Sequence, residues 1–122
     1  MKHRILVVDD QPDLRLLIRL SLRQLGDVSQ AESAEQALAM MAVDRPDLMV
    51  LDVWLGNGQS GVELCRTLRM DPRNDKLGII LLSANGQQSD IAAGLAAGAD
   101  DYIVKPFSPE GLVAAASRLL AR

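Results

Sequence analysis

Short runs of aliphatic residues recur along the chain and alternate with longer segments in which apolar residues follow helical spacing. Four of these runs occupy residues 5–8, 48–51, 79–82 and 102–104. Both faces of each run are apolar, which is typical of a parallel strand that is covered by helices on both sides. Val28 marks a fifth, more polar strand, which we place at a sheet edge. The pattern predicts an α/β domain with a five-stranded parallel sheet.

The first and the last helical segments carry clear boundary signals. One face of the first collects the apolar residues Leu14, Leu17, Ile18, Leu22 and Leu25. Pro12 is suited to open this helix and Gly26 to close it, while Ser108 and Pro109 mark the start of the last helix. Strict alternation of strand and helix with right-handed crossovers favours a doubly wound, flavodoxin-like (βα)5 sheet with strand order 2-1-3-4-5.

The middle helices have weaker signals. Ser33 with Gln36, and Ser60 with Glu63, match the capping-box spacing at the start of a second and a third helix. Segment 90–97, which is rich in alanine and glycine, is the expected fourth helix. A helix is therefore expected after each of the five strands, and these helices would cover the sheet.

Polar residues follow the apolar runs at the expected carboxyl ends of the strands. These residues are Asp9, Asp10, Asp52, Ser83 and Lys105. Doubly wound sheets bind their ligands beyond this edge. Three clustered carboxylates repel one another unless a cation lies among them, and oxygen ligands of this kind suit Mg²⁺ or Mn²⁺.

A carboxylate beside a divalent cation, with a lysine and a hydroxyl across the pocket, can accept a phosphoryl group. The product would be an aspartyl phosphate. Each residue alone has a plainer interpretation, because an aspartate at a strand end often forms a turn or caps a helix. The presence of the required group at four strand ends at once favours the functional interpretation.

Across essentially its whole length the chain resembles the receiver domains of bacterial response regulators, and in length it is nearest the single-domain chemotaxis type. The resemblance rests on segments 5–10, 26–28, 46–52, 80–84 and 98–107, together with Ala31, Ala37, Leu38, Gly61, Glu63 and Leu64. The combination is far more specific than any single match.

The resemblance implies a complete phosphorylation site. Asp52 would be the phosphoacceptor, and Asp10 and Asp52 would bind Mg²⁺ directly, with Asp9 acting mainly through water. The backbone carbonyl of Trp54 would be a further ligand. Lys105 would pair with a phosphoryl oxygen.

The resemblance also implies a switch. Ser83 would hydrogen-bond the phosphoryl group, Tyr102 would turn inward in response, and the Lys105–Pro106 peptide bond would be cis. The surface formed by the fourth helix, the fifth strand and the fifth helix would carry the signal to a downstream protein or a covalently linked output domain. A sensor histidine kinase or a histidine phosphotransfer protein would be the donor, so the domain is a signalling switch rather than a metabolic enzyme.

The loop after the phosphoacceptor departs from the family pattern. Residues 53–61 are rich in glycine and lack the methionine and proline that many members carry there. Trp54, two residues after the acceptor, either shields the acyl phosphate from water or lies on the surface without effect. Ser83 replaces the commoner threonine, which keeps the hydroxyl but loosens its rotamer.

Composition and charge limit the number of domains and the kinds of partner. The 122 residues, of which 48% are hydrophobic, suffice for one receiver domain over 1–122 with no output domain. A net charge of -3 argues against direct binding of nucleic acid. Cys65 is expected in the core and His3 at the surface, and no apolar run approaches the roughly 20 residues of a membrane helix, which favours a cytoplasmic protein.

Three other functions fit the sequence less well. A haloacid-dehalogenase-type phosphohydrolase needs an acid where this chain has Trp54. A flavin- or nucleotide-binding module on the same fold is disfavoured because the chain has no GxxxxGK(S/T) phosphate loop and its first strand ends in two acids, which would repel a phosphate. A degenerate receiver that acts only through protein contact is disfavoured by the complete set of acids, Ser83 and Lys105. The sequence leaves open the oligomeric state, the kinase, and whether the domain stands alone.

Overall fold

Strands and helices alternate strictly in the computed structural model, which describes residues 3–56 and 58–122. The strands are β1 (His3–Val8), β2 (Gly26–Ala31), β3 (Leu48–Asp52), β4 (Gly78–Ser83) and β5 (Asp101–Val104). The helices are α1 (Pro12–Leu22), α2 (Ala34–Val43), α3 (Gly61–Arg69), α4 (Gln88–Ala96) and α5 (Pro109–Leu120). This order confirms the predicted succession of elements.

All strand pairs are parallel, and the sheet order is β2-β1-β3-β4-β5. The predicted strand order and the edge position of β2 are therefore confirmed. β2 lies on one side of β1 in the sheet, and β3 lies on the other side. The loops after β1 and β3 therefore lead away from each other. A crevice at this point of the sheet is where doubly wound folds bind ligands.

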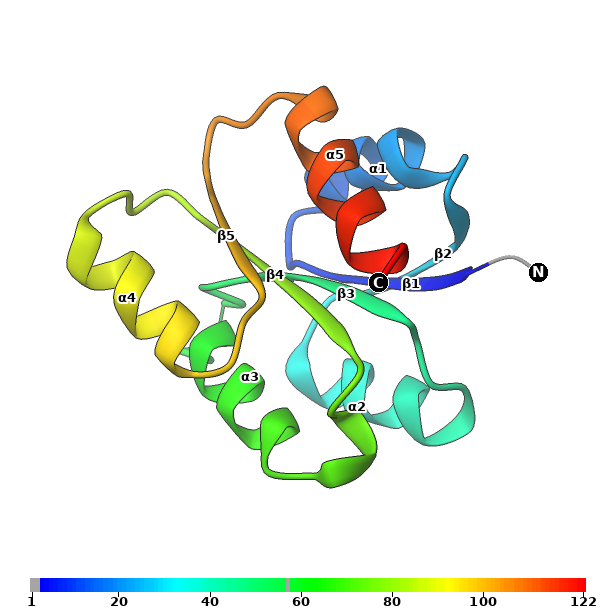
Figure 1. The fold of residues 1–122 in the computed structure, drawn as a ribbon, viewed down its shortest axis with the longest axis horizontal. Helices are drawn as coiled ribbons and strands as arrows, with labels where there is room; N and C mark the ends of the chain where they lie inside the picture. Colours follow the sequence, from blue (N-terminus) through cyan, green and yellow to red (C-terminus); the bar gives the residue numbers. More distant parts are fainter. Residues whose placement is uncertain (1–2, 57) are drawn as a thin grey trace.

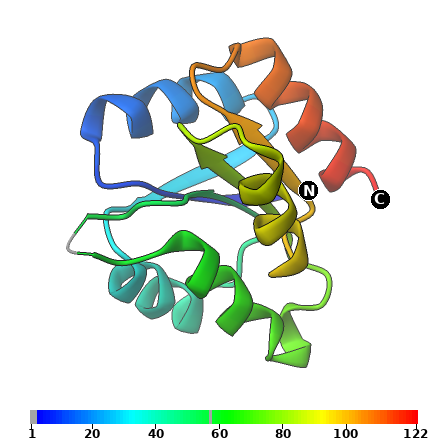
Figure 2. The same cartoon turned by 90° about the vertical axis from the view of Figure 1, so that its left-hand side faces the viewer.

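Helices cover both faces of the sheet, as Figures 1 and 2 show: α1 and α5 lie on one face and α2 and α3 on the other, with α4 beside β5. Successive strand residues point to opposite faces. Ile5 and Val7 pack with the α1 and α5 side, whereas Leu6 and Val8 pack with the α2 and α3 side. Two apolar layers of this kind require the near-continuous aliphatic runs of the sequence.

The end of α1 differs from the prediction. The helix ends at Leu22, and Gly26 is the first residue of β2 rather than the residue that closes the helix. Gly26 is paired with His3, where a Cβ would come within 2.2 Å of the His3 carbonyl oxygen. The glycine is thus required by close strand packing. Leu17, predicted on the buried face, is 43% exposed.

Serine caps open three helices. Ser33 Oγ accepts a hydrogen bond from the Gln36 backbone N–H at 3.1 Å, and Ser60 and Ser108 cap α3 and α5 in the same way. The Gln36 side chain accepts from the Glu32 N–H instead of the Ser33 N–H, so only half of the predicted capping box forms there. A 3₁₀ turn over Pro72–Asn74, which precedes β4, was not predicted.

Candidate functional site

Three carboxylates meet at the carboxyl edge of the sheet. Asp9 and Asp10 follow β1, and Asp52 is the last residue of β3. One oxygen from each lies within 4.8 Å of the others. Lys105 arrives from the end of β5 and places Nζ 3.2 Å from Asp52 Oδ2 and 3.9 Å from Asp9 Oδ2. The fold therefore brings four of the five strand-end residues into one cluster.

Asp9 is the most deeply buried of these acids, with 1% of its surface exposed. Its Oδ1 accepts a hydrogen bond from the Gln11 backbone N–H at 2.8 Å. Its Oδ2 has no hydrogen-bond partner among the described residues. Burial raises the pKa of Asp9 to about 6, against the lowering effect of the Gln11 N–H, and the negative charge of Asp52 raises it further. The protein alone leaves this carboxylate incompletely stabilised.

A divalent cation fits this arrangement of donors. The cluster offers carboxylate oxygens from three side chains, and one of these oxygens, Asp9 Oδ2, is buried without a hydrogen bond from any described residue. Hard cations such as Mg²⁺ prefer such oxygens, and a cation would remove the repulsion among them. The residues present are therefore suited to hold a metal ion.

Asp52 is buried and held from two sides. Its Oδ1 accepts a hydrogen bond from the Trp54 backbone N–H at 3.3 Å, while Oδ2 faces the Lys105 ammonium. A Cβ on Gly61 would come within 2.0 Å of the Asp52 carbonyl oxygen, so only glycine permits the loop to return this closely. Close packing at residue 61 sets the position of α3 against the end of β3.

The loop between these residues also reaches Asp10. Gly56 has a φ of 74°, and a Cβ there would lie 2.9 Å from Asp10 Oδ2. Trp54 is 58% exposed, so its side chain lies at the surface rather than in the core. Asn57, part of the glycine-rich stretch noted in the sequence, lies outside the described residues.

Ser83 and Tyr102 meet at a third residue. Ser83 is buried, and its Oγ accepts a hydrogen bond from the Asn85 backbone N–H at 3.0 Å. The Tyr102 hydroxyl donates to the Asn85 carbonyl oxygen at 2.9 Å. Asn85 was missed in the sequence because both contacts use its main chain, for which its side chain carries no signal. The neighbouring Lys105–Pro106 peptide bond is cis.

Two residues outside the cluster lie as predicted. Cys65 is fully buried in α3, and its thiol donates to the Ala97 carbonyl oxygen at 3.6 Å. Burial raises the pKa of the Cys65 thiol, which suits a packing residue better than a reactive one. His3 is partly exposed, with Nδ1 3.9 Å from Asp47 Oδ2.

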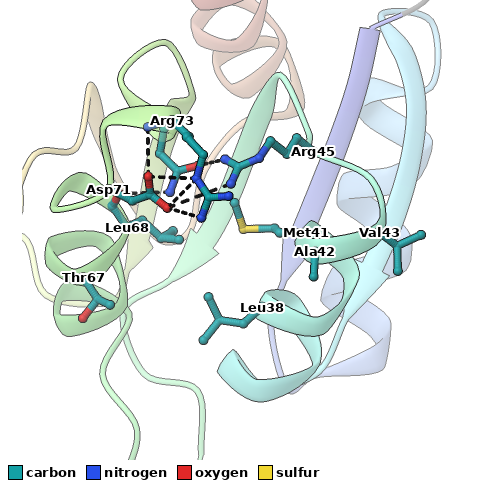
Figure 3. A pocket seen from close by; sticks show the side chains of 10 residues that line it. Leu38, Met41, Ala42, Val43, Arg45, Thr67, Leu68, Asp71 and Arg73 are labelled. Carbon is teal, nitrogen blue, oxygen red and sulfur yellow. Dashed lines mark hydrogen bonds and ion pairs between the residues drawn. The ribbon is translucent and has the colours of Figure 1, made fainter.

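A cavity of about 630 Å³ opens elsewhere, between α2, α3 and the 3₁₀ turn (Figure 3). Leu38 and Met41 of α2 line it together with Arg45, Asp71 and Arg73. It contains none of the predicted site residues, so the acid cluster is a separate feature at the sheet edge.

Among the helices in the described part of the chain, none combines the length and the apolar character that a membrane span requires.

Comparison with known proteins places these features in one family. The sequence model of the response regulator receiver domain matches residues 5–117. The phosphate regulon transcriptional regulatory protein PhoB of Rhizobium meliloti is 42% identical over 123 residues, which cover 100% of this chain and 54% of that protein. The DNA-binding response regulator MtrA of Mycolicibacterium smegmatis is also 42% identical, over 100% of this chain and 52% of its own length. The chain thus spans about half the length of these relatives.

Solved structures agree. The BeF3-activated receiver domain of DrrB superposes with a TM-score of 0.90 at 35% identity, with both chains covered completely. A putative response regulator from Chloroflexus aurantiacus gives a TM-score of 0.92 at 38% identity, again over both whole chains. Because MtrA is named as DNA-binding, the expectation that this chain makes no direct contact with nucleic acid stays a prediction. The chain belongs to the response regulator receiver domain family and serves phosphorylation-dependent two-component signalling.

Proposed function

We propose that Asp52 accepts the phosphoryl group from a phosphohistidine, on a sensor histidine kinase or a histidine phosphotransfer protein, and that the domain works as a cytoplasmic switch. The observation that carries this proposal is the 3.2 Å approach of Lys105 Nζ to Asp52 Oδ2, inside a cluster of three carboxylates. In the transfer, a carboxylate oxygen of Asp52 forms a bond to phosphorus as the phosphorus–nitrogen bond to imidazole breaks. With its other ring nitrogen already protonated, the imidazole takes the electron pair of the broken bond and leaves as a neutral group, while the Lys105 ammonium offsets charge on the phosphoryl oxygens.

Mg²⁺ is the cofactor that this chemistry calls for. Asp10 and Asp52 would hold it directly, Asp9 through water, and the backbone carbonyl of Trp54 would complete the protein ligands. When bound, the ion neutralises negative charge on the phosphoryl oxygens. The buried Asp9 Oδ2, which lacks a hydrogen bond among the described residues, supports a cation at this place.

Phosphorylation replaces the single negative charge of the Asp52 carboxylate with an acyl phosphate that carries close to two and extends further into the site, and the Ser83 hydroxyl and Lys105 are the groups able to respond. Ser83 Oγ would exchange its hydrogen bond with the Asn85 N–H for one that it donates to the phosphoryl group. Because Tyr102 bonds to the same Asn85, a shift there would be felt in β5. The surface of α4, β5 and α5 would then report the change to a downstream protein or to a linked output domain.

A phosphodonor has an apolar surface on which to dock beside the cluster. Leu16, Leu17 and Leu20 of α1 are all exposed, and α1 begins two residues after Asp10. Exposed leucines on one helix suit a helical partner. In this proposal all 122 residues form a single receiver domain, and any output function resides in another segment or another protein.

The test is a titration with Mg²⁺ and then beryllofluoride, a phosphoryl mimic, while the emission of Trp54 is followed. Trp54 is the only tryptophan and lies two residues from the proposed acceptor. We expect a Mg²⁺-dependent change on addition of beryllofluoride that is lost in Asp52→Asn. Mass spectrometry after acetyl phosphate treatment should show one added phosphoryl group in the wild type only. Absence of both signals would favour a degenerate receiver that acts by contact alone.

A further inference from the structure

Arg15 of α1 joins the carboxyl ends of β1 and β2. Its Nη1 donates to the Asp9 carbonyl oxygen at 2.7 Å, and its Nε donates to Gln30 Oε1 at 3.3 Å. Asp9 and Gln30 stand at the ends of neighbouring strands, where the Asp9 N–H also donates to the Ala31 carbonyl oxygen at 3.1 Å. Arg15 is half-buried, and both bonds are partly shielded from water.

The choice of partner is informative. Arg15 lies beside three clustered aspartates, yet within residues 3–56 and 58–122 it forms no ion pair with any of them. Its charge-assisted hydrogen bond goes to a main-chain oxygen instead. Arg15 therefore does not occupy the carboxylates, which stay available to a cation, while it holds the backbone that carries two of them.

Holding the Asp9 carbonyl has a defined geometric effect. The peptide unit from the Asp9 carbonyl to the Asp10 N–H is planar, so a hydrogen bond to the carbonyl oxygen fixes the plane of the whole unit. That plane sets the direction in which the chain leaves Asp9 and presents the Asp10 side chain. With the Asp9 N–H bound to Ala31, the main chain of Asp9 is held on both sides.

We propose that Arg15 is a positioning residue for the Mg²⁺ site, which it serves by orienting the Asp9–Asp10 peptide without touching the ion. This inference rests on the proposed function of the acid cluster. Groups that orient metal ligands from behind typically change metal affinity 10- to 100-fold when they are removed. Because Arg15 acts on the main chain rather than on a ligating carboxylate, we expect a smaller effect, of about three- to tenfold.

The sign of the effect separates positioning from simple electrostatics. A guanidinium repels a dication, so removal of its positive charge alone should tighten Mg²⁺ binding. Loss of positioning should weaken it. Arg19 provides a matched control, since it lies one turn further along α1, is exposed, and has no side-chain hydrogen bond or ion pair among the described residues.

The experiment measures Mg²⁺ affinity from Trp54 emission in the wild type, Arg15→Met, Arg15→Lys, Gln30→Met and Arg19→Met, with thermal unfolding in EDTA alongside. Arg15→Met should bind Mg²⁺ about three- to tenfold more weakly, and Arg19→Met equally or slightly more tightly. Arg15→Lys keeps the charge but lacks the rigid fork, so its affinity should fall between those of Arg15→Met and the wild type. Gln30→Met, which removes one brace without a charge change, should weaken binding less than Arg15→Met.

Equal affinities in Arg15→Met and Arg19→Met, or tighter binding in Arg15→Met, would overturn the inference and leave the phosphorylation site intact. If Arg15→Met does not fold in EDTA, the same decision rests on Arg15→Lys and Gln30→Met, where wild-type affinity in both would overturn it. A wild type that does not respond to Mg²⁺ at all would overturn both the metal site and the role of Arg15.

Discussion

Two carboxylates at opposite edges of the sheet differ in how completely the protein satisfies them. At the amino edge, Asp100 Oδ2 accepts hydrogen bonds from the Ile79 N–H and from Arg69 Nη2, both at 2.9 Å, and Oδ1 accepts from Arg122 Nη1 at 3.0 Å. At the carboxyl edge, one oxygen of Asp9 has no hydrogen bond among the described residues. Both acids lie largely out of contact with solvent.

The difference separates a structural ion pair from a site that needs a ligand. Arg69 also donates to the Gly98 and Asn74 carbonyl oxygens, so its guanidinium is used entirely within the fold. Among the described residues, the cluster around Asp9 has one ammonium, from Lys105, for three carboxylates. A buried carboxylate whose hydrogen bonds are all supplied by the protein stabilises the fold. A buried carboxylate that lacks partners destabilises the fold but stays available to bind a ligand.

The largest effect on stability is expected at the amino edge of the sheet, where the Asp100 carboxylate has all its partners. Arg69→Ala would leave Asp100 short of one partner and would free the Gly98 and Asn74 carbonyl oxygens. We expect the free energy of unfolding to fall by about 2–4 kcal/mol, because loss of one member of a poorly solvated pair exposes the desolvation penalty of the other. Urea unfolding measures this change.

Arg73→Ala is the matched control. Arg73 pairs with Asp71, but its side chain is 74% exposed. Exposed pairs contribute little, so a change below about 1 kcal/mol is expected. A similar loss in both variants would show that the completeness of the Asp100 contacts is not what matters.

At the carboxyl edge of the sheet, removal of a charge should stabilise the protein instead. Asp9→Asn should raise the free energy of unfolding of the Mg²⁺-free protein at pH 8 by about 1–3 kcal/mol. The pKa of Asp9 is about 6 in the folded protein and near 3.8 in the unfolded chain, so folding favours the neutral form of the carboxyl group. The penalty is complete above about pH 6 and gone below about pH 4. Urea unfolding in EDTA at pH 8, 6 and 4 tests this.

Saturating Mg²⁺ is the control for the same variant. It should stabilise the wild type more than Asp9→Asn and so reduce the gap between them, since binding to the folded state adds stability. An Asp9→Asn protein that unfolds more easily than the wild type at pH 8 without Mg²⁺ would contradict the view of Asp9 as unsatisfied.

A smaller effect is expected for the exposed indole of Trp54, two residues after Asp52. If Trp54 keeps water from the acyl phosphate, Trp54→Ala should lose its phosphoryl group roughly threefold faster, a barrier change of about 0.6 kcal/mol. The decay is followed by intact-protein mass spectrometry after acetyl phosphate treatment. Met70→Ala, an exposed apolar residue remote from the cluster, should decay like the wild type. Equal decay in all three proteins would mean that the indole does nothing.

The smallest effect lies at the cavity of Figure 3, where Asp71 joins Arg45 and Arg73. Hydrogen bonds from the Arg73 side chain and backbone lower the pKa of Asp71 to about 2. The stabilisation is therefore present above about pH 4 and lost as the pH falls towards 2. Asp71→Asn keeps the capping oxygen and removes the charge. Its melting temperature should be slightly below that of the wild type at pH 7 and equal to it near pH 2, and a constant gap would exclude the charge as the cause.

The sheet could be predicted in detail because buried parallel strands demand aliphatic residues on both faces, which few other structures do. The errors fall where one residue type serves two purposes. Gly26 has the position of a glycine that closes a helix, although it is needed where β2 meets His3. Leu17 fits the apolar spacing of α1 but is exposed, since spacing does not reveal how wide a stripe the neighbouring α5 covers.

The acids and Lys105 could be predicted to converge because strand ends meet at one edge. The supporting contacts could not. Arg15 and Arg19 look alike in the sequence, and only the path of the backbone brings one of them to the Asp9 carbonyl. Asn85 contributes its main-chain groups, to which the identity of its side chain is irrelevant.

The pairing of Lys105 with Asp52 spans 53 residues and depends on the ladder from β3 through β4 to β5. The 3.2 Å approach therefore exists only while these three strands are paired. A partly unfolded molecule in which β5 has left the sheet would lack the ammonium beside Asp52. Such a molecule would be a poor phosphoryl acceptor, so phosphorylation would report an intact sheet as well as a signal.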